Sequence, residues 1–164
     1  MVMDTGKLTI RRAQAGDGRA LASLAGQLGY PTRGSDAERQ WSLLTREEGH
    51  AVFVAELEGY GIVGWSHLMP RQLLYVPRLA EIAGLVVDAE HRRRGVGRAL
   101  IHATEQWAKG QGYSTLVVRS NAARKEAHTF YPVLGYCHVK TQMVYGKELK
   151  GQKRAAGPCS KLRA

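Results

Sequence analysis

The feature that most constrains the fold is an apolar segment that runs into a basic turn and then into an amphipathic helix. The apolar segment spans residues 82–87, the turn contains Gly95 and Gly97, and the helix follows at once. Glycine lets the backbone approach a ligand closely and adopt a positive φ at no steric cost. A helix N-terminus presents unpaired N–H groups and a partial positive charge, which favour phosphate. Because four arginines surround the turn, the segment predicts a pyrophosphate-binding site.

Two common phosphate-binding motifs do not fit this turn. The dinucleotide motif Gly-x-Gly-x-x-Gly needs a glycine where the chain has Leu100, and no Gly-x-x-x-x-Gly-Lys-Ser/Thr sequence is present. The pattern that fits is Arg-x-x-Gly-x-Gly, formed by Arg92, Gly95 and Gly97. A basic turn that only caps a helix would explain the same residues, so other parts of the sequence are needed to distinguish a binding turn from a capping turn.

Charge narrows the choice of partner without identifying it. The chain has 164 residues, enough for one domain with a hydrophobic core, and a formal net charge of +10. Residues 89–125 hold eight Lys/Arg against two acids, and residues 147–164 hold six against one. Such clusters favour any polyanion, including a nucleotide cofactor or a nucleic acid.

Several classes of protein are disfavoured by what the sequence lacks. No apolar run approaches the length of a membrane span, and residues 1–5 do not resemble the apolar part of a signal peptide. Cys137 and Cys159 are too few for a disulfide framework, and no Cys/His spacing suggests a metal site. We therefore expect a cytoplasmic protein with no membrane partner and no metal.

Hydrophobic periodicity predicts alternating strands and helices. Strands are expected at 8–13, 51–57, 62–68, 82–87 and 115–120, with one or two more within 136–145, and residues 70–77 are expected to form a loop. Helices are expected from an N-cap at Asp17 to Gly29, from Ser35 to Leu44, after the basic turn, and at 126–134. The order mixes a hairpin with crossover helices, so it predicts an α/β (α+β) protein with a mixed sheet.

A second motif makes the assignment specific. It reads Ser120-Asn121-x-x-Arg124-x-x-Ala127-x-x-Phe130-Tyr131-x-x-Leu134-Gly135-Tyr136. Together with Arg92-x-x-Gly95-x-Gly97 and the element order, it resembles the GCN5-related N-acetyltransferase (GNAT) superfamily over about residues 7–146. The resemblance implies the GNAT fold, with antiparallel N-terminal strands, a parallel pair formed by 82–87 and 115–120, and helices on both faces. Residues 147–164 are then expected to be a basic, mobile tail.

The resemblance also implies a set of site residues. Acetyl-CoA, as the acyl donor, is expected to contact the end of the buried strand, the basic turn and the downstream motif, at Leu85, Val86, Val87, Arg92, Arg93, Arg94, Gly95, Val96, Gly97, Arg98, Asn121 and Tyr131. Tyr131 is expected to protonate the departing thiolate. Glu81, at the start of the buried strand, is expected to be the general base, although a solvated strand end would place a glutamate there equally well.

These expectations combine into one predicted function with two alternatives. The main prediction is direct transfer of the acetyl group of acetyl-CoA to a primary amine in a ternary complex. The acceptor is a small molecule or peptide, and Arg33, Arg71 and Arg78 favour one that also carries a carboxylate or phosphate. The alternatives are a catalytically silent acyl-CoA-binding regulatory domain and a basic nucleic-acid-binding protein. The second is disfavoured because aromatic residues are not interleaved with the basic ones. Apolar residues 73–76 suggest a homodimer.

Overall fold

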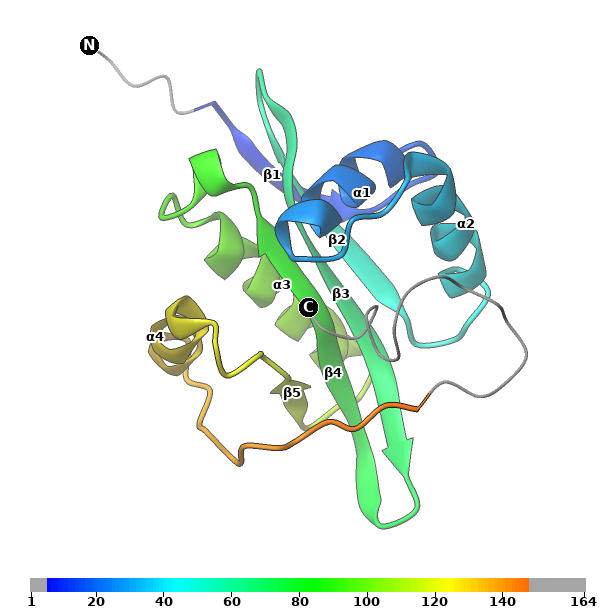
Figure 1. Ribbon diagram of the computed structural model, residues 1–164, viewed down its shortest axis with the longest axis vertical. Helices are drawn as coiled ribbons and strands as arrows, with labels where there is room; N and C mark the ends of the chain where they lie inside the picture. The colour runs from blue at the N-terminus through cyan, green and yellow to red at the C-terminus, as the bar shows by residue number, and fades with distance from the viewer. Residues whose placement is uncertain (1–5, 148–164) are drawn as a thin grey trace. The chain divides into compact units, whose positions relative to one another are not determined.

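A five-stranded mixed sheet organises the first of two compact units in the computed structural model, which describes residues 6–147 (Figure 1). The units divide between Arg119 and Ser120. The elements follow in the order β1 (Leu8–Arg12), α1 (Gly18–Gln27), α2 (Gly34–Leu44), β2 (Ala51–Leu57), β3 (Gly61–Leu73), β4 (Val76–Val87), the short 3₁₀ helix η1 (Ala89–His91), α3 (Val96–Gly110), β5 (Leu116–Val118) and α4 (Lys125–Val133).

The strands lie in the order β1-β2-β3-β4-β5. All neighbouring pairs are antiparallel except β4 and β5, which are parallel. This confirms the mixed sheet and its predicted parallel pair. The β4–β5 pairing ends at Ile82 opposite Val118, whereas β4 continues to Val87. Among the described residues, 83–87 of β4 therefore have β3 on one side and no strand on the other.

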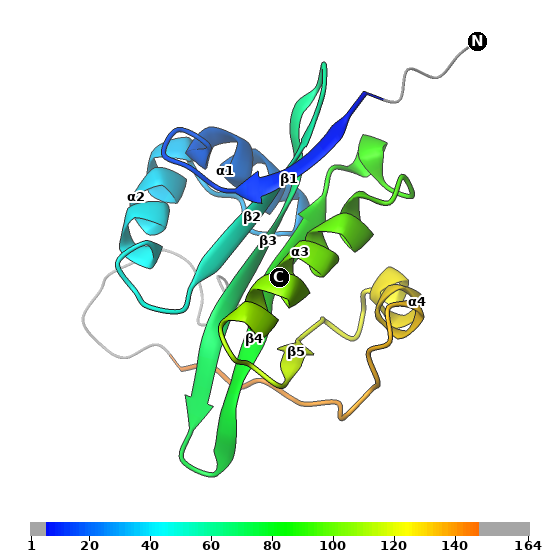
Figure 2. The ribbon, with the colours of Figure 1, turned by 180° about the vertical axis from the view of Figure 1, so that it is seen from behind.

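Helices cover both faces of the sheet, as expected (Figures 1 and 2). On one face, α3 packs against a core whose members include Phe53, Val63, Leu68, Ala80 and Leu100. On the other face, α1 and α2 cover a smaller cluster of Ala13, Val52 and Val54 with partly buried Leu21, Trp41, Ile62 and Trp65. Side chains alternate between the faces along each strand, so position in a strand decides which helices a residue meets.

The β3–β4 hairpin is longer than expected, and the predicted loop at 70–77 is wrong. Both strands continue through that segment, and only Leu74 and Tyr75 lie between them. Proline disfavours a central strand because it lacks the N–H of the ladder. Pro70, however, lies beyond Leu68, the last β3 residue paired with β2, so that edge of β3 is open. The residue at which β2 stops pairing with β3 is not visible in the local sequence around Pro70.

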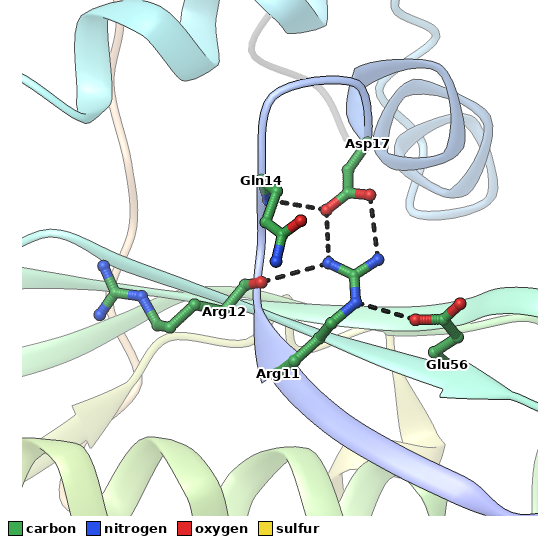
Figure 3. Close-up of polar contacts among 5 residues, drawn as sticks. All are labelled: Arg11, Arg12, Gln14, Asp17 and Glu56. Atoms are coloured by element: carbon green, nitrogen blue, oxygen red, sulfur yellow. Dashed lines mark hydrogen bonds and ion pairs between the residues drawn. The ribbon is translucent and has the colours of Figure 1, made fainter.

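The corner between β1 and α1 is held by an ion-pair cluster rather than by the expected side-chain cap. Asp17 occupies the N-cap position but makes no capping hydrogen bond to the helix. Its carboxylate accepts two bonds from the Arg11 guanidinium, at 2.8 and 3.1 Å, and one from the Gln14 N–H at 2.7 Å (Figure 3). Arg11 also reaches Glu56 of β2 at 2.8 Å. These bonds, chiefly those from Arg11, hold the pKa of Asp17 below its ordinary value.

The second unit contains α4 and an extended segment. Residues 134–147 contain no helix or strand, so the expectation of a strand within 136–145 is wrong for the described chain. Val139, Met143, Val144 and Tyr145 are exposed there, and a strand needs both a partner and a buried face. Of the predicted tail, residues 148–164 lie outside the described residues. No helix within 6–147 is both long and apolar enough to span a bilayer.

Candidate functional site

The turn after β4 has the backbone geometry of an anion site. Gly95 is the N-cap residue of α3 with φ 81°, and Arg93 has φ 59°, a left-handed conformation that is uncommon for a residue other than glycine. No side chain caps the helix. Its first backbone bond runs from the Ala99 N–H to the Gly95 carbonyl at 3.0 Å. The N–H groups of Val96, Gly97 and Arg98 therefore lack a partner within the helix.

The arginines around this turn leave most of their charge uncompensated. Arg92 donates from Nε to the Val87 carbonyl at 3.2 Å, which ties the turn to the end of β4. Arg93, Arg94 and Arg98 are exposed and form no ion pair with any of residues 6–147. The structure thus brings the predicted cradle residues 92–98 together as a positively charged loop with free N–H groups.

The strand end beside the cradle is open on one edge. Leu85, Val86 and Val87 pair with β3, at Ser66, Trp65 and Gly64 respectively. Their other edge faces away from β3, beyond the point where pairing with β5 stops. Backbone amides on an open edge can hydrogen-bond an extended ligand as a neighbouring strand would. The predicted strand-end residues therefore adjoin the cradle, with their backbone edge available.

A glutamine clamp, which the sequence did not reveal, joins this region to α1. Gln27, the last residue of α1, donates from Nε2 to Asp88 Oδ2 at 2.8 Å and accepts at Oε1 from the Ala89 N–H at 3.0 Å. Asp88 also accepts from the Glu90 N–H at 2.9 Å. These bonds, that from Gln27 foremost, hold the Asp88 pKa below its ordinary value. These bonds attach the segment between β4 and the cradle to the end of α1, which lies on the sheet face opposite α3.

Glu81 is buried and doubly paired. It is 6% exposed on β4, where its Oε2 lies 2.6 Å from Arg71 Nη1 and its Oε1 lies 3.5 Å from Arg119 Nε. Because Ala80 belongs to the core under α3, Glu81 points to the other sheet face. Both carboxylate oxygens therefore contact a guanidinium, and the solvated strand end considered from the sequence is excluded.

Two histidines meet on the same face as Glu81. His50, just before β2, lies with Nδ1 3.1 Å from Nε2 of His67 on β3. The other ring nitrogen of His50 is 3.3 Å from Glu47 Oε2. Burial, with a smaller contribution from the charge of His50, lowers the pKa of His67 to about 4. His67 is therefore neutral at pH 7.

The three arginines expected to attract an acidic acceptor differ in the contacts that they make. Arg71 is engaged by Glu81, and Arg78 donates to the Tyr113 hydroxyl at 2.9 Å while its guanidinium lies over the Tyr113 ring. Arg33 is exposed at the N-cap of α2 and forms no ion pair with the described residues. Of the three, only Arg71 is paired with an acid, whereas Arg33 and Arg78 are exposed and have no ion pair within residues 6–147.

Asn121 and Tyr131 belong to the second unit. The Asn121 side-chain oxygen accepts from the Ala123 N–H at 2.9 Å, which closes a turn before α4 and leaves its amide hydrogens as donors. Tyr131 packs edge-on against Phe130 and Tyr136. Burial raises the pKa of Tyr131 to about 12, so its hydroxyl stays protonated over the neutral range. Within their unit, both residues lie in the predicted strand-to-helix segment.

The backbone features of the site are visible in the sequence, whereas its side-chain pairs are not. Glycines and arginines in a strand–turn–helix pattern are visible locally, whereas Gln27 meets Asp88 from 61 residues away. The histidine pair did leave a signal. His50 and His67 flank the two ends of a predicted hairpin, and antiparallel pairing brings such ends together.

Comparisons with known proteins place the fold and the family. The family model described as "Acetyltransferase (GNAT) family" matches residues 19–136. The chain is 34% identical over 92 residues to human N-acetyltransferase 8, covering 55% of this chain and 40% of the relative. It is 29% identical over 105 residues to N-acetylaspartate synthetase of Xenopus tropicalis, covering 64% and 36% respectively. The chain thus spans about two fifths of the length of these curated relatives.

Among solved structures, the fold is similar to that of the aminoglycoside N-acetyltransferase AAC(6')-Iy in complex with CoA. The TM-score is 0.79 at 18% identity, and the match covers 91% of this chain and all of the other. At this identity the likeness concerns the fold alone. It agrees with the mixed sheet, the parallel β4–β5 pair and the two helix layers described above.

Proposed function

The chain belongs to the GNAT acetyltransferase family, and from that premise we propose that it transfers the acetyl group of acetyl-CoA to a primary amine. The observation that carries the proposal is the uncapped, arginine-rich N-terminus of α3 beside the open edge of β4. A pyrophosphate needs N–H donors and positive charge, and an amide-bearing arm needs an unpaired strand edge. Both requirements are met within the first unit.

The donor would be held mostly by backbone. The pyrophosphate would accept from the N–H groups of residues 93–98, with Arg93, Arg94 and Arg98 supplying charge. The pantetheine amides would bond to the open edge of β4 at Leu85–Val87. Asn121, in the second unit, stays a contact predicted from the family resemblance. A backbone N–H in that strand segment would meet the oxyanion that forms when the amine attacks the thioester.

Tyr131 is proposed to deliver a proton to the departing thiolate. Its raised pKa keeps the phenol protonated at neutral pH, which is the form an acid needs. The same shift makes the phenol a weaker acid, so it can act only on a thiolate that develops charge in direct contact with it.

The general-base role of Glu81 stays a prediction, and the geometry around its carboxylate favours another role. Its Oε2 is hydrogen-bonded to Arg71 at 2.6 Å and its Oε1 lies 3.5 Å from Arg119, so the carboxylate is already engaged by two guanidinium groups of the protein. We propose that this cluster forms a fixed, charged wall of the acceptor site, between β3, β4 and the end of β5.

The acceptor is proposed to be a small amine or a peptide amine. Curated relatives are named N-acetyltransferase 8 and N-acetylaspartate synthetase, and the second name points to an amine that carries carboxylates. Arg33 would suit an acidic group of that kind, as the sequence suggested. A polycationic aminoglycoside suits the arginine-rich surroundings less well, although structural neighbours act on aminoglycosides.

The test is CoA release from acetyl-CoA with a panel of L-aspartate, neamine and a lysine-containing peptide. We expect turnover with at least one amine, and we expect Tyr131→Phe to lower kcat by about 10- to 100-fold while the KM for acetyl-CoA stays within about twofold. Phe130→Leu, which alters the ring packed against Tyr131, is the control and should retain kcat. An unchanged kcat in Tyr131→Phe would remove the acid role. Tight acetyl-CoA binding with no amine acetylated would favour the regulatory alternative.

A further inference from the structure

Polar contacts just before the cradle converge on the carboxylate of Asp88, which lies between β4 and η1. It accepts from Gln27 Nε2 at 2.8 Å and from the Glu90 N–H at 2.9 Å, and it lies 3.1 Å from His91 Nδ1. The N–H of Asp88 itself donates to the Val63 carbonyl of β3 at 2.8 Å. Asp88 therefore joins the segment that leads into the cradle both to the sheet and to the end of α1.

The side-chain amide of Gln27 makes two complementary bonds to this segment. Its Nε2 donates to Asp88 Oδ2 at 2.8 Å, and its Oε1 accepts from the Ala89 N–H at 3.0 Å. The opposite orientation of the amide would place Oε1 against the carboxylate and Nε2 against the N–H, so only the orientation described satisfies both groups. A shorter apolar side chain at this position would lose both bonds.

The backbone of the cradle has a conformation that depends on fixed ends. Arg93 has φ 59° and Gly95 has φ 81°. The left-handed conformation is unfavourable for a residue with a Cβ, and it persists where the surrounding structure holds it. After the turn, buried Val96 anchors the start of α3 in the core. Before the turn, the His91 ring packs edge-on against Tyr60, and the glutamine clamp adds its polar bonds.

The helix that carries Gln27 is anchored to the sheet by other contacts. Trp65 of β3 donates from Nε1 to the Leu21 carbonyl of α1 at 3.3 Å. The Trp65 ring covers Gly84 of β4, where a Cβ would lie 2.7 Å from Cζ3 of the ring and 4.0 Å from Cδ2 of Leu28. Because these contacts do not involve Gln27, loss of the clamp should leave α1 in place and release only the segment before the cradle.

We propose that Gln27 is a positioning residue for acetyl-CoA, which acts through Asp88 and Ala89 on the backbone of the cradle. This inference rests on the proposed function. The amide of Gln27 is occupied by these two partners, so it restricts the segment 88–91 rather than contacting the ligand. A site that is already ordered binds its ligand more tightly than one that the ligand must order. The clamp therefore contributes to the affinity for acetyl-CoA more than to the stability of the fold.

The test is calorimetric titration of acetyl-CoA into three variants of the full chain. Gln27→Ala removes both bonds without a change of charge and should raise the Kd by about 5- to 10-fold. Asp88→Asn places two amide donors against each other and should also raise the Kd, although the loss of a negative charge beside the cradle would by itself lower it. The exchanged pair Gln27→Glu/Asp88→Asn restores a donor and an acceptor at the original net charge. Its Kd should return to within about twofold of that of the unmodified chain.

Gln106→Ala, at an exposed glutamine of α3, is the matched control and should keep the Kd of the unmodified chain. The Tm of every variant should stay within about 4 °C of that of the unmodified chain, and a larger fall in Gln27→Ala would indicate a structural role and overturn the proposal. Equal affinity in Gln27→Ala, tighter binding by Asp88→Asn, or an exchanged pair that binds no better than Asp88→Asn would overturn this inference alone. If the unmodified chain did not bind acetyl-CoA, the proposed function would fail with it.

Discussion

Glu81 illustrates how strongly a single buried charge depends on its partners. Burial removes its carboxylate from water, and the contacts with Arg71 and Arg119 offset the free-energy cost of that desolvation. Removing Arg71, the nearer partner, therefore leaves the buried charge of Glu81 poorly compensated. Removing the charges of both Arg71 and Glu81 leaves no such buried charge. The contrast gives a test of the proposed wall of the acceptor site that is independent of catalysis.

Arg71→Met should lower the free energy of unfolding by about 2–3 kcal/mol, below the full cost of breaking a buried pair because Arg119 remains. Arg71→Met/Glu81→Gln should recover a large part of that loss, since the amide carries no charge. Urea unfolding of the two variants measures the difference. If the double variant were less stable than Arg71→Met alone, Glu81 would not depend on Arg71.

The helices and strands differ in how far their positions depend on local sequence signals. Three of the five strands, β1, β2 and β5, and all four helices lie close to their expected positions because periodicity and glycine punctuation are local signals. The long β3–β4 hairpin was missed because Pro70 breaks a strand only where another strand needs its N–H. Residues 136–145 have strand-forming side chains, but no strand pairs with them in the described chain. In both cases the missing information was non-local.

The corner of β1 and α1 offers a test with a defined pH dependence. The pKa of Asp17 in the folded protein is below its ordinary value of 3.8, so the Arg11 pair is fully stabilising above that value. The stabilisation is lost as the pH falls through the lowered pKa. Asp17→Asn should cost about 1–2 kcal/mol at pH 7, and the difference from the unmodified chain should narrow below pH 4.

Chemical unfolding between pH 7 and pH 2 measures this difference. Asp36→Asn, which breaks only a surface pair of 3.6 Å with Arg39, is the matched control and should change stability by less than about 0.5 kcal/mol. If the difference in unfolding free energy between Asp17→Asn and the unmodified chain widened toward acid pH, the pKa of Asp17 would not be lowered in the folded protein.

The tip of the β3–β4 hairpin is an exposed apolar surface of the molecule that could contact a second copy. Leu74 and Tyr75 are exposed where the two longest strands turn, in the apolar segment that suggested a homodimer. We propose that this tip packs on a second copy. Sedimentation should then give a dimer for the unmodified chain and a shift toward monomer for Leu74→Asp. Leu43→Asp, at an exposed leucine of α2, should remain dimeric. A monomer before any substitution would contradict the proposal.

The cradle of residues 92–98 is proposed to bind acetyl-CoA through its pyrophosphate. The most direct measurement is calorimetric titration of acetyl-CoA into the unmodified chain, into Gly97→Glu and into Gly110→Glu. The same substitution at opposite ends of α3 separates a charge placed in the cradle from a charge placed on the helix. We predict one-to-one binding that is lost in Gly97→Glu and kept in Gly110→Glu. Equal affinity in all three proteins, or no binding to the unmodified chain, would show that the cradle does not bind the acetyl-CoA pyrophosphate.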